Sequence, residues 1–328
     1  MQHNSFAPLY PLWQKLRKMI HKYSYFGGYM AVLFLFGAGA SFGSGPCSPS
    51  NPPLGKDLLI RMREKGGVAS TIDGALLESF IADPEQGMIN FFNERNCETT
   101  HLLKQMCAYL AQFRVEKENT YIKLFNLLKK RKNICMATTN YDLLIEQAIC
   151  SVGCLVQYHS SKRNRNNIPV LKIHGSVNFI PVANIVNIDF ELPDCENSAI
   201  FDGPIDIYND EQDVIAYCES DSALSPAVAL YHPKKSVLHC PSFVKYQQEE
   251  FRSEVERSSK IFIIGLKINP NDEHIWSEIE KTSADVYIVD KDKESTITWV
   301  NSLSKKNIYH IADTFDESIV RIKNILQL

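Results

Sequence analysis

The sequence predicts an α/β protein: a doubly wound, Rossmann-like parallel sheet with a small helical layer inserted into it. Three observations predict it. Short runs rich in β-branched and aromatic residues recur along the chain and are apolar at most positions, which is typical of parallel strands covered on both faces. Amphipathic helical patterns separate several of these runs, as βαβ units require. One long segment between the first two runs has helical patterns throughout.

The apolar runs and the helical stripes define the expected elements of the sheet domain. In the helical stripe at 121–128, Tyr121, Leu124 and Phe125 fall on one face. The expected strands are 31–36, 133–139, 154–158, 170–174, 260–265, 285–290 and 307–311. The other expected helices are 142–149, 243–258, 272–282 and 316–328.

Two long segments interrupt the alternation of strands and helices. Residues 56–114 contain four short helical patterns and are expected to form the inserted helical layer. Residues 180–240 mix Asp, Asn and Pro with short apolar pieces, which indicates an insertion of irregular β-structure and loop. We therefore expect an N-terminal helical extension over 1–30 and one sheet domain over 31–328 that carries both insertions.

Composition excludes several classes of protein. The chain has 328 residues, 45% of them hydrophobic and 22% charged, which is typical of a soluble globular protein. Its formal net charge of -3 gives no basic field for nucleic acid, and its longest apolar run, near 29–36, is too short to span a membrane. The N-terminus does not have the form of a signal peptide, so we expect a cytoplasmic protein.

The nine cysteines are scattered and form no CxxC pair. That spacing favours neither a zinc ribbon nor a thioredoxin-type site, and reduced, mostly buried thiols are the expectation. No bound metal is expected.

A glycine-rich stretch, GAGAS, follows the first apolar run directly. Gly37 and Gly39 lack Cβ atoms, so main-chain N–H groups could approach a phosphate there, and Ser41 could add a hydroxyl. An ordinary turn after a strand is the alternative interpretation. The strict GxGxxG fingerprint is absent, although Gly43 falls close to its last position.

Polar residues gather where two further strands are expected to end. The stretch TTNYD brings Thr139, Asn140 and Asp142 together, although one of them could simply cap the next helix. His174 follows the run VLKI, where it could be a core histidine or could face the same edge of the sheet. Ligands of open α/β sheets bind at the carboxyl ends of the strands, which favours a shared site.

Two later expected strands, 260–265 and 285–290, also lead into candidate site residues. Gly265 closes one buried strand and Asp272 opens the following helix. Asp290 ends the next strand, where a carboxylate could bind a ribose hydroxyl or could serve only a turn.

Taken in order, the motifs GAGAS, TTNYD, IHGS and IGLKINPNDEHI resemble the sirtuin superfamily, and more narrowly the sirtuin-like NAD hydrolases of bacterial anti-phage defence. They extend from Val32 to about Asp290. The resemblance implies that NAD is the substrate and that Asn140 and His174 line the cleavage site. The candidate cofactor-binding residues are Gly37, Ala38, Gly39, Ser41, Thr139, Asp142, Gly265, Asp272 and Asp290.

The departures from the deacylase pattern narrow the expected activity. Sirtuin deacylases carry a zinc module of two CxxC pairs after the histidine, and here Cys195, Cys218 and Cys240 stand alone. Their P-D-F-R stretch is replaced by PPLGKDLL, and Leu266-Lys267 stand where a Tyr-Ser pair is usual. The first two differences, the missing zinc module and the missing P-D-F-R stretch, argue against protein deacylation.

The resemblance therefore implies an NAD glycohydrolase that releases nicotinamide and ADP-ribose, as an NAD-depleting abortive-infection effector. A catalytically quiet NAD or ADP-ribose binding module in a defence complex is the alternative, and an ADP-ribosyl transferase or deacylase is a third. Because unrestrained NAD hydrolysis would kill the host, we expect control by a separate sensor protein or by homo-oligomerisation. We further expect Gly39→Val to abolish NAD binding and to leave the fold largely intact.

Overall fold

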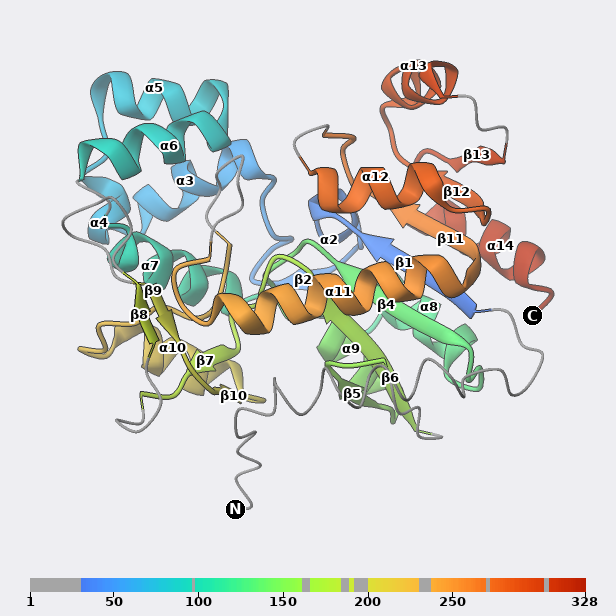
Figure 1. Cartoon of the computed structure of the whole chain (residues 1–328), viewed down its shortest axis with the longest axis horizontal. Coiled ribbons are helices and arrows are strands. Elements are labelled where there is room, and N and C mark those ends of the chain that lie inside the picture. The colour runs from blue at the N-terminus through green and yellow to red at the C-terminus, as the bar shows by residue number, and fades with distance from the viewer. Residues whose placement is uncertain are drawn as a thin grey trace.

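A parallel sheet forms the centre of the protein (Figure 1). The computed structural model describes residues 31–95, 98–160, 166–183, 189–191, 200–229, 237–269, 272–303 and 307–328. The strands of the sheet are β1 (Ala31–Phe36), β4 (Ile134–Thr138), β5 (Leu155–Gln157), β6 (Asn167–Lys172), β11 (Ser258–Ile264), β12 (Asp285–Val289) and β13 (Ile308–Ala312). All seven are parallel, in the order β13-β12-β11-β1-β4-β6-β5.

Both faces of the sheet are buried, which explains why the strands are apolar without alternation. In β1, Phe34 and Phe36 pack into one hydrophobic core, whereas Leu33 and Leu35 pack into a second core on the opposite face. All four side chains are fully buried. A strand enclosed in this way has no solvent-facing positions, so both alternating sets of side chains must be apolar.

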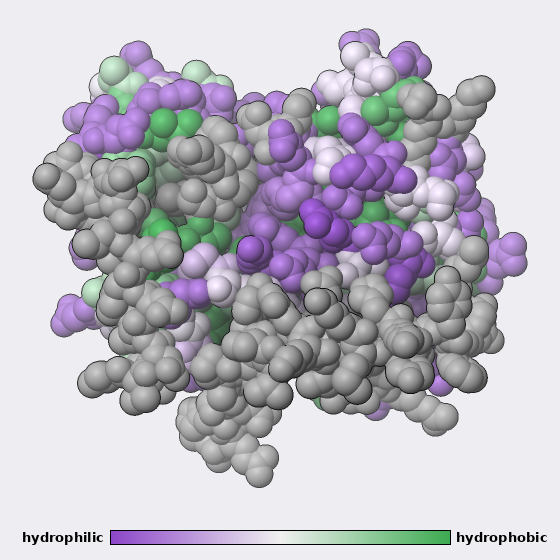
Figure 2. Space-filling model, in the orientation of Figure 1, coloured by the Kyte–Doolittle hydropathy of each residue, from purple (hydrophilic) through white to green (hydrophobic). Residues whose placement is uncertain are grey.

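Helices on each face complete these two cores. The core that contains Phe34 receives side chains from several helices, among them α8 (Thr120–Leu128), α9 (Leu144–Ser151) and α14 (Phe315–Leu326). The opposite core receives them from α11 (Pro241–Arg257) and α12 (Glu273–Lys281). The outer surface over α11 and α12 is mostly hydrophilic (Figure 2), as expected of helices with one buried face.

The sequence-based prediction of a doubly wound sheet is confirmed, including all seven strands and the five helices expected around them. Strand β6 begins at Asn167 and ends at Lys172, so His174 lies two residues beyond the strand rather than at its last position. Helix α13 (Lys293–Ser302) was not predicted, because Thr296 is its one buried residue and no apolar stripe marks it.

Residues 56–114 form helices, as expected. The segment contains α3 (Gly55–Glu64), α4 (Gly67–Ser70), α5 (Gly74–Ala82), α6 (Pro84–Glu94) and α7 (Thr100–Ala111). The short helix α4 is additional to the four predicted, since Gly66 and Gly67 both have positive φ and separate it from α3. Before this layer, β1 leads into α2 (Ala38–Phe42), and β2 (Cys47–Ser48) pairs with β3 (Arg114–Val115).

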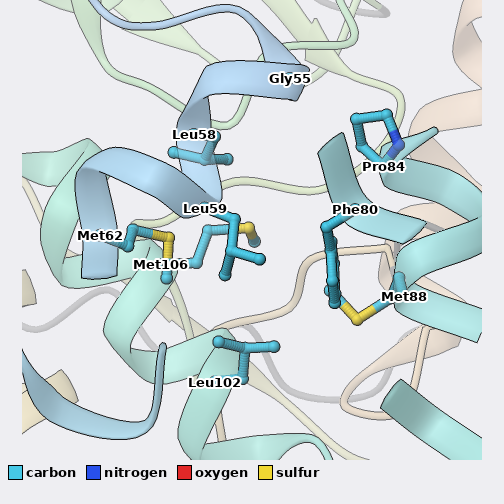
Figure 3. A pocket seen from close by; sticks show the side chains of 9 residues that line it. All are labelled: Gly55, Leu58, Leu59, Met62, Phe80, Pro84, Met88, Leu102 and Met106. Atoms are coloured by element: carbon cyan, nitrogen blue, oxygen red, sulfur yellow. The ribbon is translucent and has the colours of Figure 1, made fainter. Parts of the chain in front are cut away.

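A small apolar cavity lies inside the helical layer (Figure 3). It has a volume of about 30 Å³, and three methionine side chains point into it. No hydrogen-bonding side chain lines it, so it is a packing gap and not a site for a nucleotide. Its lining residues are Gly55, Leu58, Leu59, Met62, Phe80, Pro84, Met88, Leu102 and Met106.

The second insertion, 180–240, is more regular than expected. Two antiparallel pairs occur there, β7 (Phe179–Pro181) with β10 (Ile205–Ile207), and β8 (Asp189–Glu191) with β9 (Ile200–Asp202). Helix α10 (Glu211–Glu219) was not predicted and begins at the cap Asp210, whose side chain accepts from Gln212 N.

The proposed N-terminal extension, 1–30, lies outside the described residues, and the division of the chain into the expected parts stays a prediction. Among the described residues, no helix is both long enough and apolar enough to cross a bilayer.

Candidate functional site at the carboxyl edge of the sheet

The order of the strands places a ligand crevice beside β1. From β1 the chain builds β4, β6 and β5 on one side, and it returns to build β11, β12 and β13 on the other. The strand order therefore reverses between β1 and β11. In open α/β sheets, ligands bind outside the carboxyl ends of the strands at such a switch point. Figure 1 shows these ends directed toward the helical layer, and Asn269, after β11, donates to Glu85 of α6 at 3.3 Å.

The glycine-rich turn after β1 packs directly against the turn after β11. Gly37 N donates to Ile264 O at 3.0 Å, and Gly39 N donates to Gly265 O at 2.8 Å. Gly265 has φ +58°, a conformation that side-chain-bearing residues rarely adopt. Both glycine N–H groups after β1 are thus used within the protein. The glycines serve first to let two backbones approach each other.

The absence of Cβ atoms at these glycines is a requirement of that contact. A Cβ on Gly265 would lie 2.2 Å from Ala40 N, and one on Gly37 would lie 2.5 Å from Leu266 Cα. A Cβ on Gly39 would lie 2.9 Å from Gly265 O. The expectation that Gly39→Val would spare the fold is therefore wrong, because the larger side chain would push the two turns apart.

Asn140 is fixed against the glycine-rich turn. Its Nδ2 group donates to Gly37 O and to Ser41 Oγ, both at 2.9 Å, and its N–H donates to Thr138 Oγ1 at 3.0 Å. Ser41 Oγ also lies 3.2 Å from the hydroxyl of Tyr121. Both amide hydrogens of Asn140 are therefore used, which leaves Oδ1 as the atom of this side chain that can meet a substrate. Asn140 is 7% exposed.

A buried ionic cluster supports the loop that carries Asn140. Lys172 Nζ, which is fully buried, lies 3.2 Å from Glu146 Oε1 and donates to Asp142 O at 2.5 Å. Burial raises the pKa of the Asp142 and Glu146 carboxyls above their usual values, and the Lys172 ammonium opposes that rise in both. Asp142 Oδ1 also accepts from Leu144 N at 3.1 Å, although the N-cap residue of α9 is Leu143 and no side chain caps this helix.

His174 meets two residues of the segment that opens α12. Its Nε2 atom lies 3.0 Å from Nε2 of His274 and 3.9 Å from Oδ1 of Asp272. His174 and Asp272 are 5% and 6% exposed, whereas His274 is half-buried. Asp272 is the N-cap residue of α12 and His274 is the second residue of the helix, so the start of one helix presents both groups.

The remaining predicted residues are more accessible. Thr139, Ala38 and Gly39 are half-buried, which leaves part of both turns within reach of a ligand. Asp290 is half-buried and Asp292 N donates to its Oδ1 at 2.8 Å. That bond gives Asp290 the turn role that the sequence left open. Asp290 follows β12, which is two strands away from β1 in the sheet.

The residues that meet at this edge of the sheet fall into two groups that we name for their contents. The glycine half consists of Gly37, Gly39, Gly265, Asn140 and Ser41. The histidine half consists of His174, His274 and Asp272. Strands β4 and β6 are adjacent and connect the halves, since Ile173 N donates to Thr138 O at 3.1 Å.

Three residues of the site were not recognised from the sequence. His274 lies within the motif INPNDEHI but was not singled out, and Tyr121 was assigned only to an apolar stripe. Lys172 could have been recognised from the sequence, because a lone lysine inside the apolar run VLKI needs a buried partner.

No protein-family model and no curated protein matches the sequence. Among solved structures, the fold is similar to that of a mutant Sir2 homologue in complex with ADP-ribose, with a TM-score of 0.43 and 16% identity over 91% of this chain and 94% of that one. It is also similar to a Sir2 homologue in complex with NAD, with a TM-score of 0.36 and 14% identity over 99% and 98% of the two chains. A Sir2 protein bound to a myristoylated histone peptide gives a TM-score of 0.40 and 11% identity over 90% and 92%. Because the likeness is low, the roles of the residues at this edge of the sheet depend on their own contacts.

Proposed function

We propose that the protein hydrolyses NAD at the N-glycosidic bond of nicotinamide and releases nicotinamide and ADP-ribose. One observation carries the proposal. Asn140 and His174 follow the neighbouring strands β4 and β6; Asn140 donates to Gly37 O in the glycine-rich turn after β1, and His174 meets Asp272 and His274, which follow β11. An amide, an imidazole and a glycine-rich turn at this edge are the groups that the resemblance to sirtuin-like NAD hydrolases requires.

The reaction needs a group that orients the attacking water and a base that accepts its proton. It has less need of an acid to protonate the leaving group. The bond between the ribose C1′ carbon and the pyridinium nitrogen breaks with its electron pair going to nicotinamide, which leaves as a neutral molecule. Water supplies the oxygen that bonds to C1′ and loses one proton. A histidine, whose ordinary pKa lies near neutrality, suits the acceptance of that proton.

The contacts of Asn140 and His174 suggest separate roles. Because Nδ2 of Asn140 is held by Gly37 O and Ser41 Oγ, its Oδ1 would accept a hydrogen bond from the attacking water or from a ribose hydroxyl. His174 would act as general base toward either group. Asp142, whose main-chain oxygen accepts from Lys172 and whose carboxylate accepts from Leu144 N, would hold the loop instead of attacking.

Binding of the rest of NAD would use the accessible parts of the turns. Ala38 and Thr139 are half-buried and offer a backbone N–H and a hydroxyl for the pyrophosphate and ribose. Binding energy gained there can be used to orient the nicotinamide ribose for cleavage. Asp272, which faces His174, would hold that histidine or a ribose hydroxyl in place.

The test measures nicotinamide release from NAD by the full chain, alone and together with proteins from neighbouring genes. We expect Asn140→Ala and His174→Ala to lower the rate at least about a hundredfold, the scale of one lost general base or orienting group. Asn126→Ala and His101→Ala serve as matched controls, because both side chains are exposed, Asn126 on α8 and His101 on α7.

Two outcomes would contradict the proposal. Release that persists undiminished in both site variants would show that the reaction occurs elsewhere. No release under any condition, with tight NAD binding retained, would instead favour a quiet NAD or ADP-ribose binding module.

The biological role follows from the resemblance. We propose that NAD depletion serves an abortive response to phage infection in the cytoplasm. Such an activity must be restrained until infection, so a sensor protein or self-assembly would control it. The insertion 180–240 or the N-terminal stretch PLWQKLRKMIHKY, residues 11–23, is the proposed contact surface.

A further inference from the structure

We propose that His174, His274 and Asp272 form a binding site for a divalent transition-metal ion of the Zn²⁺ type. One ligand atom from each side chain lies within 4.8 Å of the other two. Among the described residues, this is the one group of three His, Cys, Asp or Glu side chains close enough to share an ion. None of the three is on the exposed surface, where acidic clusters commonly occur without a metal.

The distances between ligand atoms are close to those around a single ion. Zinc bonds to imidazole nitrogen at about 2.0–2.1 Å, so two nitrogens at a tetrahedral angle lie about 3.3 Å apart. The two Nε2 atoms are 3.0 Å apart, and Asp272 Oδ1 is 3.9 Å from His174 Nε2. Side-chain rotations that move the ligand atoms by less than about 1 Å would bring all three atoms to bonding distance of one ion.

The donor set selects the kind of metal. Two neutral imidazoles and one carboxylate suit Zn²⁺ and its first-row neighbours, whereas Ca²⁺ and Mg²⁺ prefer oxygen ligands alone. Three protein ligands leave a fourth position open, as in zinc sites that exchange a water. His274 is half-buried, which gives an ion access to the otherwise buried pair.

The backbone positions the three ligands before any ion binds. Asp272 and His274 are two residues apart at the start of α12, where Ile275 N and Trp276 N both donate to Asp272 O, at 2.9 and 3.0 Å. His174 is fixed from the opposite side, because Ala229 N donates to its carbonyl at 2.8 Å. A site with ligands already held in place loses less entropy when it binds an ion.

Metal binding would control the proposed hydrolysis. The Nε2 atom of His174 that would coordinate the ion is no longer available to accept a proton. A bound ion would therefore keep the enzyme inactive, and its removal would release the base. This regulatory consequence rests on the proposed NAD hydrolysis, whereas the binding of metal does not.

Equilibrium dialysis of the metal-stripped full chain against Zn²⁺ tests the site, with Co²⁺ as a spectroscopic probe. We expect about one tightly bound ion per chain and, for Co²⁺, visible absorption of a four- or five-coordinate centre. His274→Gln and Asp272→Asn should each weaken binding at least about tenfold, since each removes one of three ligands. His101→Gln, an exposed histidine on α7, should bind as the unaltered chain does.

The results separate the site from the function. Absence of binding to the unaltered chain, or full binding to a His174→Gln/His274→Gln double variant, overturns the metal site. If NAD hydrolysis occurs, Zn²⁺ should inhibit it in the unaltered chain and should inhibit His274→Gln at least about tenfold less strongly. Metal binding by a chain that never releases nicotinamide would support the site and reject the hydrolase.

Discussion

The two halves of the site are built by different physical means. The glycine half depends on backbone contacts: a Cβ on Gly265 would lie 2.2 Å from Ala40 N, and Asn140 is bonded to Gly37 O and Ser41 Oγ. The histidine half consists of three side chains that meet at the start of a helix, and one of them is half-buried.

This difference suggests that the two halves of the site have different roles. The glycine half should set the stability of the protein at the switch point, because its contacts are close-packed and cannot adjust. The histidine half should carry proton transfer and metal binding at little cost in stability. Substitutions on the two sides should therefore differ in the property that they change.

The largest loss of stability is expected for Gly265→Ala. The new Cβ would meet the backbone of Gly39 and Ala40, and the residue would keep φ +58°, so we expect a loss of more than about 4 kcal/mol in the free energy of unfolding. Gly153→Ala is the matched control, because Gly153 has φ +78° but nothing lies within 4 Å of its added Cβ. It should lose about 1–2 kcal/mol, the cost of the backbone conformation alone.

Urea denaturation of both glycine variants measures these free energies. Equal losses in the two variants would show that strain at positive φ, and not the contact between the two turns, accounts for the requirement for glycine at 265.

Lys172→Met should cost about 3–5 kcal/mol at pH 7.5, because it leaves the buried carboxylates of Glu146 and Asp142 without their counter-charge. Their pKa values are already raised by burial and would rise further without the ammonium group. Carboxyls with raised folded-state pKa values stabilise the fold when protonated, and that contribution is lost as pH rises through those values. The deficit of the variant should therefore shrink between pH 7.5 and pH 5.

Lys104→Met is the control for this pH dependence. Lys104 is also buried, but its Nζ donates to the carbonyl oxygens of Ser220 and Ser222, which do not titrate. Its deficit in urea denaturation should be the same at both pH values. A Lys172→Met deficit that is also independent of pH would contradict the proposed support of the Asn140 loop by titrating carboxyls.

Asn140→Ala should lower the free energy of unfolding by about 1–3 kcal/mol, because the buried carbonyl of Gly37 and the hydroxyl of Ser41 each lose one donor. Thermal unfolding of this variant and of Asn126→Ala provides the comparison. The exposed Asn126 should change stability by less than about 0.5 kcal/mol. If the two variants are equally stable, Asn140 has no structural role, and any loss of hydrolysis would be a direct effect on the reaction.

The smallest change in stability is expected for His274→Gln. The side chain is half-buried and glutamine can keep a polar group near His174, so we expect a loss below about 1 kcal/mol. The same thermal measurement checks this. A loss as large as that of Asn140→Ala would mean that the histidine half is also structural, and the contrast between the halves would fail.

Much of the fold can be predicted from the sequence, because burial on both faces of a sheet requires a run of consecutive apolar residues in each strand. The run at 31–36 could be identified as a strand since each of its residues must be apolar, and the stripe with Tyr121 and Leu124 could be identified as a helix for a similar reason. Helix α13 has no apolar stripe in its sequence, because Thr296 is its only buried residue.

The candidate residues were likewise found by their place after strands. The carboxyl ends of parallel strands share one edge, so Asn140, His174 and Gly265 could be expected near one another before their contacts were known. Asp290 followed the same rule, but its carboxylate is used in its own turn. The position of a residue after a strand therefore predicts that it lies at this edge of the sheet. It does not predict which group its side chain contacts.

By itself, the sequence determined the strands, most of the helices and the edge at which the polar residues collect, because these depend on local periodicity and on the rule for parallel strands. Only the tertiary structure decided that Gly37 and Gly39 pack against Gly265, that Lys172 bonds to the main chain of Asp142, and that His274 meets His174. These contacts join residues 30 to more than 200 positions apart in the chain, as with Lys172 and Asp142 or Gly37 and Gly265. Local pattern carries no information about such pairs, since the packing of one turn against another fixes them.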